Sequence, residues 1–454
     1  MDSIQQCLAH YACDLRYDDI TAEAKHAAKV RVIDTLGALF AGFFAEPCRI
    51  SRNLAARMPD PAGATIIGTR MKTAPDLAAF VNGITARYIE LTDNYQKAGS
   101  FGGHPSDVIT PLLGVAEFAH ASGRDLITSV LIAYETYTRL SDGFDNMGFD
   151  HATFNCLGVA MGAGKLLGLS VEQLSHCIAM AIVPNNILRQ VRTGHMSMFK
   201  ATASGQAARA GVYAALLARA GMEGPHLPFE GKAGWCDHVA RKRFDLDIMR
   251  NSKPCKILDT SIKLRPCGGL SISSVLAAEK VAPLRSASVK RVVVEVYKHA
   301  WERAGSGEHR WNPDSRETAD HSIPYLVAAT LMDGTVNTRT FDDAHLWNPE
   351  LRAVMKKIEV IEDAEFTNAF ERLPQQHRTR VTVVTSNDER LVGESGGEEN
   401  DLATQKSAAQ IVEKFRGLTE DTLGSARVTA LLERLWHLDE IQDMAELPPT
   451  LNII

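Results

Sequence analysis

The sequence has no C-x-x-C pair, although it contains eight cysteines. They are scattered at positions 7, 13, 48, 156, 177, 236, 255 and 267, a pattern that disfavours a zinc site or an iron–sulfur cluster. The first residues, MDSIQQCLAHYACDL, have neither the basic segment nor the apolar stretch of a secretory signal. Scattered cysteines without such a signal predict a cytoplasmic protein.

Long apolar runs and an excess of positive charge are also lacking. No run of about eighteen apolar residues occurs, so we expect no membrane span. The 49 basic and 55 acidic side chains give a formal charge of −6. This charge does not predict a basic surface that would bind a nucleic acid or a membrane. What remains is a chain of 454 residues with ordinary composition, long enough for two or three domains.

Most of the first 250 residues follow a helical period. Several of the periodic stretches are apolar nearly all round and rich in Ala and Gly, which is typical of helices buried inside a bundle. These stretches are residues 24–44, 108–121, 126–140, 154–169, 171–183 and 204–222. The sequence therefore predicts a large all-helical domain.

The pattern changes near Lys263. Residues 289–298, 356–363 and 379–386 alternate and are rich in β-branched side chains, which predicts strands with helical runs between them. The tail from Leu402 is helical again, after the polar loop SGGEEND at 395–401. We expect an all-helical domain at 1–265, completed by helices in 402–454, and a smaller α+β domain at 266–401.

The stretch YIELTDNYQKAGSFGGHPSD, residues 88–107, is the first candidate for chemistry. Gly102 and Gly103 allow positive φ, and Pro105 disfavours helical backbone at His104. The loop would present an imidazole near carboxylates, as general acid–base catalysis requires. The alternative is a turn between helices with a hydrogen-bonded histidine.

Three further segments are candidates. Residues 188–209 are basic, and Lys200 near a helix start would meet an anion, unless the segment is a solvated turn. Residues 263–274 lie at the domain junction, a common place for ligands, although they could form a plain linker. His151 could cap the helix that follows or point into a cleft, and Asp150 or Thr153 could be the helix N-cap instead.

Two patterns are misleading. GVAMGAGK, residues 158–165, resembles a phosphate loop, but its spacing is wrong by one residue, no Ser or Thr follows, and no strand precedes it. A tight helix crossing is the better interpretation. His299, His309 and His321 lack metal-ligand spacing, so we expect no metal there.

Taken together, the chain resembles the MmgE/PrpD family, which includes 2-methylcitrate dehydratase, cis-aconitate decarboxylase and iminodisuccinate epimerase. The resemblance covers nearly the whole chain. Its motifs are VIDTLGALFAG, GGHPSD, GVAMGAGKLLGLS, AARAGVYAALLARAGMEGP and ETADHSIPYLVAATLMDG. It implies an all-helical domain with an α+β lid, a homodimer, a small polycarboxylate substrate, and no metal or organic cofactor.

The resemblance also implies site residues. Catalytic roles are expected for Glu90, Asp93, His104, His151, Lys200 and Lys263, and substrate contacts for Asn94, Arg189, Arg192 and Tyr325. Glu90 and Asn94 depart from the family motif, which has Asp and Thr there. The decarboxylase-type members carry a histidine after the Lys-x-x-Pro turn, where this chain has Gly268.

These assignments imply proton movement next to a carboxylate. Cations would neutralise the developing aci-carboxylate, and histidines would transfer protons. The leading hypothesis is a cofactor-independent hydro-lyase acting on 2-methylcitrate, an acid of propionate metabolism, or on a close tricarboxylate. A decarboxylase or epimerase of a related acid is the second. A non-catalytic protein that binds polycarboxylates is the third.

Overall fold

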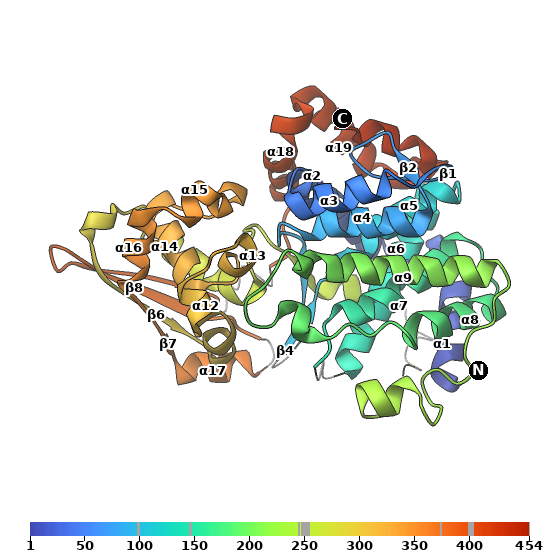
Figure 1. Ribbon diagram of the computed structural model, residues 1–454, viewed down its shortest axis with the longest axis horizontal. Helices are drawn as coiled ribbons and strands as arrows, with labels where there is room; N and C mark the ends of the chain where they lie inside the picture. Colours follow the sequence, from blue (N-terminus) through green and yellow to red (C-terminus); the bar gives the residue numbers. More distant parts are fainter. Residues whose placement is uncertain are drawn as a thin grey trace.

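The computed structural model describes residues 1–97, 100–144, 148–243, 246, 255–372, 375–397 and 404–453. Within these ranges the chain forms a large helical domain and a smaller α+β domain beside it (Figure 1). The fold class predicted from the sequence is confirmed. None of the described helices combines the length and apolarity that a bilayer crossing requires.

The helical domain is a bundle whose central members are apolar on nearly every side. Its helices in chain order are α1 (Ser3–Asp14), α2 (Ala22–Gly42), α3 (Glu46–Ala55), α4 (Pro75–Arg87), α5 (Ile109–Phe118), α6 (Gly123–Gly143), α7 (Ala152–Leu166), α8 (Val171–Ile182) and α9 (Phe199–Arg219). Small residues bring helices together, since a Cβ on Gly83 of α4 would lie 3.3 Å from the Cα of Gly205 on α9. Gly162 packs as closely against Leu112, so GVAMGAGK is a helix crossing inside α7, as expected.

The lid is a four-stranded sheet in the order β7-β6-β8-β9, covered by short helices. The strands are β6 (Val289–Val296), β7 (Ile358–Glu362), β8 (Thr379–Thr385) and β9 (Arg390–Ser395), with β6 and β7 parallel and the other pairs antiparallel. The helices that position the site are α10 (Ile272–Glu279), α12 (Glu308–Trp311) and α14 (Ile323–Asp333). Three strands were predicted, and β9 was not.

The last helices return to the first domain. Helices α18 (Ala408–Leu423) and α19 (Ser425–Trp436) lie against α2, where Phe415 fills the space over Gly37 and Lys414 pairs with Asp34 (Figure 1). One apolar cluster joins residues 4–262 with residues 411–451, and a second cluster spans residues 267–383 of the lid. The predicted border at 265–266 lies between these clusters, whereas the one at 401–402 lies outside the described residues.

A small sheet joins two distant segments of the chain. Strand β3 (Asp93–Lys97) pairs antiparallel with β4 (Ser100–Gly103) on one side and with β5 (Thr260–Ile262) on the other. The stretch expected to be a loop is thus largely a β-hairpin. Because Asp93 pairs with Ile262, the residues near Glu90 lie beside Lys263.

Candidate active site

A cavity of about 440 Å³ lies between the helical domain and the lid. Both domains supply its walls. The lining residues with polar or charged side chains are Arg87, Glu90, His104, His151, Arg189, Arg192, Thr193, Ser271, Glu302, Arg303, His309, Arg310 and His321. Five of them are arginines and two are glutamates, so the cavity suits a ligand with several negative charges.

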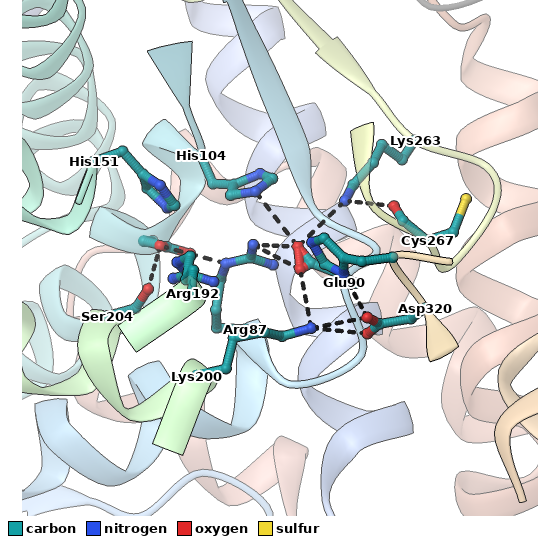
Figure 2. Close-up of polar contacts among 12 residues, drawn as sticks. Arg87, Glu90, His104, His151, Arg192, Lys200, Ser204, Lys263, Cys267 and Asp320 are labelled. Atoms are coloured by element: carbon teal, nitrogen blue, oxygen red, sulfur yellow. Dashed lines mark hydrogen bonds and ion pairs between the residues drawn. The ribbon is translucent and has the colours of Figure 1, made fainter. Parts of the chain in front are cut away.

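Glu90 is the centre of the charged network. It follows α4 with a left-handed backbone, φ 56°, and its side chain is buried. Its carboxylate lies 3.8 Å from Lys200 Nζ and 3.7 Å from Lys263 Nζ, and it accepts hydrogen bonds from Arg87. Figure 2 shows these side chains converging on Glu90 from different elements. A left-handed conformation is uncommon for a residue other than glycine and marks a position held by its surroundings.

Electrostatics keeps Glu90 ionised. Burial alone would raise its pKa, but Arg87, Lys263 and Lys200 hold it well below the ordinary value. The same burial lowers the pKa of Lys263 to about 8, although Glu90 opposes the shift. Lys263 also donates to the carbonyl of Cys267 at 3.2 Å.

Arg87 was not predicted from the sequence. It ends α4 three residues before Glu90, and its Nη2 donates to the Glu90 carboxylate at 2.8 Å. Its Nε lies 3.7 Å from Asp107 Oδ2. Burial raises the pKa of Asp107 to about 6, against the effect of Arg87, and Ser204 donates to this carboxyl at 2.5 Å.

His104 is held in one tautomer by the hairpin. Its Nδ1 lies 2.6 Å from the main-chain carbonyl of Asp93, and a carbonyl can only accept, so Nδ1 carries the hydrogen. Its Nε2 lies 3.5 Å from Glu90 Oε1. Burial, with Arg87 and Lys263, lowers the pKa of His104 well below the ordinary value. The neutral ring therefore presents a lone pair at Nε2.

The buried Asp93 carboxylate holds the backbone around His104 in place. It accepts from the main chain of Ser106 at 3.0 Å and from the Tyr134 hydroxyl at 2.9 Å. Asp93 is fully buried and does not line the cavity. It therefore fixes the turn that carries His104.

His151 stands beside His104 at the start of α7. The two rings make an edge contact with centroids 5.1 Å apart. Burial lowers the pKa of His151 to about 3, although Asp150 opposes the shift. Asp150 accepts from Arg192 Nε at 2.9 Å, and Arg192 Nη2 has no hydrogen-bond partner in the ranges that the structure describes. Arg192 is thus anchored through Nε while Nη2 remains for a ligand.

Lys200 links the helical domain to the lid. Its Nζ donates to both oxygens of Asp320, at 3.0 and 2.9 Å. Glu90, Asp320 and His321 bring ligand atoms within 4.8 Å of one another, a spacing that a metal ion would also suit. The Lys200 ammonium already neutralises these carboxylates, so we assign no metal there. Asp320 was missed, and His321 was considered only as a metal ligand and set aside, because an ADHS stretch before an apolar helix looks like an ordinary helix start.

The structure brings most of the expected residues together but not all. Glu90, His104, His151, Arg189 and Arg192 line the cavity, and Lys200 and Lys263 lie directly behind Glu90. Asn94 is buried in β3 away from the cavity lining. Tyr325 lies in the lid core, where its hydroxyl donates to the carbonyl of Thr340 at 2.5 Å. Neither Asn94 nor Tyr325 reaches the cavity.

The chain belongs to the MmgE/PrpD family. Residues 6–247 match the MmgE/PrpD N-terminal domain, and residues 266–438 match the MmgE/PrpD C-terminal domain. Human cis-aconitate decarboxylase is 24% identical over 480 residues, covering 100% of this chain and 95% of the human protein. The mitochondrial 2-methylcitrate dehydratase of Yarrowia lipolytica is 24% identical over 428 residues, covering 87% and 78%. The 2-methylcitrate dehydratase of Escherichia coli is 24% identical over 376 residues, covering 78% and 76%.

Proposed function

We propose that the protein is a hydro-lyase that removes water from a small tricarboxylate, with 2-methylcitrate as the first choice. The excess of arginine over carboxylate in the cavity lining carries this proposal. Arg87 and Arg192 already pair with Glu90 and Asp150, so two or three substrate carboxylates would balance the charges of Arg189, Arg303 and Arg310. The 2-methylcitrate dehydratases among the relatives support the same choice.

The proposed reaction begins with loss of a proton next to a carboxylate. His104 accepts that proton at Nε2, and Glu90 at 3.5 Å stabilises the imidazolium that forms. Lys200, Lys263 and Arg87 supply the positive charge that stabilises the aci-carboxylate. Arg189 and Arg192 hold the carboxylates that do not react. His151 supports the ring of His104.

Decarboxylation or epimerisation is the alternative within the same site. Human cis-aconitate decarboxylase matches the chain over its full length, which favours this candidate. Gly268 argues against decarboxylation, because the decarboxylase-type pattern has a histidine at this turn. Dehydration and epimerisation both begin with loss of a proton next to a carboxylate, whereas decarboxylation forms its carbanion by loss of CO₂. The cations of the site would stabilise the negative charge in each of these reactions.

A single experiment separates these functions. The purified protein, treated with EDTA, is incubated in D₂O with 2-methylcitrate, citrate, cis-aconitate or iminodisuccinate and followed by proton NMR. A new signal from a methyl group on a double bond with 2-methylcitrate, or a new vinylic proton signal with citrate, is the expected result. Itaconate from cis-aconitate would establish a decarboxylase, and deuterium exchange without a new product would indicate an epimerase. No change with any of the four acids would refute the proposal and favour a protein that only binds polycarboxylates.

We also propose that two copies of the chain associate. Ile50, Leu54 and Met58 are about half exposed and follow one another at a helical spacing of four residues along and just beyond α3. Phe199 and Tyr213 of α9 are similarly exposed. Burial of such side chains against a second copy would stabilise a homodimer.

A further inference from the structure

His321 lies on the lid wall of the cavity and has no role in the reaction outlined above. It precedes α14, and its side chain is 26% exposed, compared with 3% for His104 and 4% for His151. Its ring is therefore the most accessible of these three imidazoles. A ligand in the cavity would meet it directly.

Gly268 makes room for this ring. A Cβ on Gly268 would lie 2.8 Å from Cδ2 and 3.0 Å from Nε2 of His321, closer than real Cβ atoms approach other groups. The main-chain N–H of Gly268 donates to the carbonyl of Asp320 at 2.8 Å, so the loop is fixed at this place. Nε2 of His321 thus occupies the space that a side chain at residue 268 would fill, on a loop that lines the cavity.

Asp320 fixes the orientation of His321. Its Oδ1 pairs with Nδ1 of His321, while both its oxygens accept from Lys200. Burial would raise the pKa of Asp320, but Lys200 and His321 hold it below the ordinary value, so the carboxylate is ionised and accepts the Nδ1 hydrogen. His104 instead donates its Nδ1 hydrogen to a neutral carbonyl. The carboxylate lets His321 hold a second proton more readily than His104.

We propose that His321 is a further catalytic residue that protonates the departing hydroxyl group, with Asp320 as its positioning residue. This assignment rests on the hydro-lyase function proposed above. His104 accepts the proton as the C–H bond breaks, the electron pair forms the C=C bond, and the C–O bond breaks. The departing oxygen takes the Nε2 proton of His321 and leaves as water. His104 then returns one proton to solvent, and His321 regains one.

The protonation of His321 depends on the ligand. In the empty cavity, burial and Lys200 lower its pKa to about 4, so the ring is neutral near pH 7. The ionisable groups around it are Lys200 of α9, Glu90 after α4, Asp320 beside it, His309 and Arg310 of α12, and Lys263 after β5. A bound trianion adds negative charge and raises the pKa. Turnover at saturating substrate should therefore fall as the pH rises through the pKa of the complex.

The test compares two rates in D₂O with 2-methylcitrate. His321→Asn should lower the dehydration rate by at least a hundredfold while deuterium exchange at the substrate carbon stays within about threefold of wild type. Gly268→Ala, which displaces the ring, should change the ratio of the dehydration rate to the exchange rate by about tenfold. His345→Asn is the matched control, because His345 pairs with Asp333 in the same domain but does not line the cavity. Equal loss of both rates in His321→Asn, or loss of neither, would overturn the assignment.

A second measurement does not require turnover. Tricarballylate, a tricarboxylate without a hydroxyl group, is added to ¹⁵N-labelled protein, and the imidazole signals are assigned with the His321→Asn variant. His321 should gain a proton when the ligand binds, and a ring that stays neutral in the complex would overturn the assignment. If none of the four acids reacts, the hydro-lyase function fails and the assignment of His321 falls with it, whereas dehydration by a protein whose His321 stays neutral in the complex overturns the assignment alone.

Discussion

Glu90 shows how a single side chain organises the site. Its carboxylate lies among the charged groups of Arg87, Lys200 and Lys263, so each of these cations is partly neutralised before a substrate arrives. Such a network is costly to break, because a buried charge that loses its partner is strongly destabilising. Removal of any member should therefore weaken the chemistry and reduce the free energy of unfolding, although the helices still form.

Lys200 allows a direct test of this view. Lys200→Ala should lower turnover by about a hundredfold, because it removes positive charge from the developing aci-carboxylate, while the far-ultraviolet circular dichroism stays native. The matched control is Lys165→Ala, since Lys165 donates to the carbonyl of Cys13 far from the cavity lining. Kinetics unchanged from wild type would remove Lys200 from the site.

His104 should act on the reaction more than on binding. His104→Ala should lower kcat by about 10²- to 10⁴-fold with a much smaller change in KM, because proton transfer occurs in the transition state. Steady-state kinetics on the substrate found by NMR gives both values. An increase in KM alone would make His104 a binding residue.

Lys263 predicts a pH dependence. Its pKa is lowered to about 8, so the ammonium is present below that pH and is lost above it. Because an anionic substrate needs the ammonium, kcat/KM should fall as the pH rises through about 8. Lys263→Arg keeps the charge and should move this decline to higher pH. A decline at the same pH in the variant would assign it to another group.

The sequence singled out residues of the charged cluster where a motif isolates them. His104 stands out because Gly-Gly and Pro surround it, and Lys263 because it precedes Pro and two glycines. Arg87 and Asp320 could not be predicted in this way, since an arginine at a helix end and an acid before a helix are common. Their role arises only when β3 and β5 pair and the lid meets the bundle.

At the level of elements, close helix crossings depend on small residues. Helices α4 and α9 meet at Gly83 and Gly205, and a Cβ on Gly205 would lie 2.6 Å from Ile84 and 2.7 Å from the carbonyl of Phe80. The pattern of the sequence predicted a buried helix at residues 204–222, within and just beyond α9, but it predicted neither α4 nor the crossing. Strand β9 was missed because RLVGES has few of the β-branched side chains that identify the other strands.

The crossing can be tested with two glycine substitutions. Gly205→Val should reduce the free energy of unfolding by about 1–3 kcal/mol, because the added atoms have no space. Gly417→Ala in α18 should increase it by about 0.5–1 kcal/mol, since nothing lies within 4 Å of its Cβ and alanine favours the helix. Urea unfolding followed by circular dichroism measures both. A Gly205→Val variant as stable as wild type would contradict the packing described.

At the level of the whole molecule, the exposed apolar face of α3 predicts a dimer. Leu54→Arg should shift the protein toward the monomer in light scattering coupled to size-exclusion chromatography, because an arginine in that position would be buried without a partner. Arg57→Ala, at an exposed position in the turn after α3, serves as a surface control. A wild-type monomer at micromolar concentration would refute the homodimer.

Helices α18 and α19 also constrain the order of folding. They complete the apolar cluster that begins with α1, so the bundle closes only after more than four hundred residues have been synthesised. The lid has its own apolar cluster and lies entirely within the chain made before that point. On a ribosome the lid can therefore fold first, while the first helices remain incompletely packed, with apolar surface exposed. Chaperones should therefore bind mainly to the N-terminal half of the nascent chain.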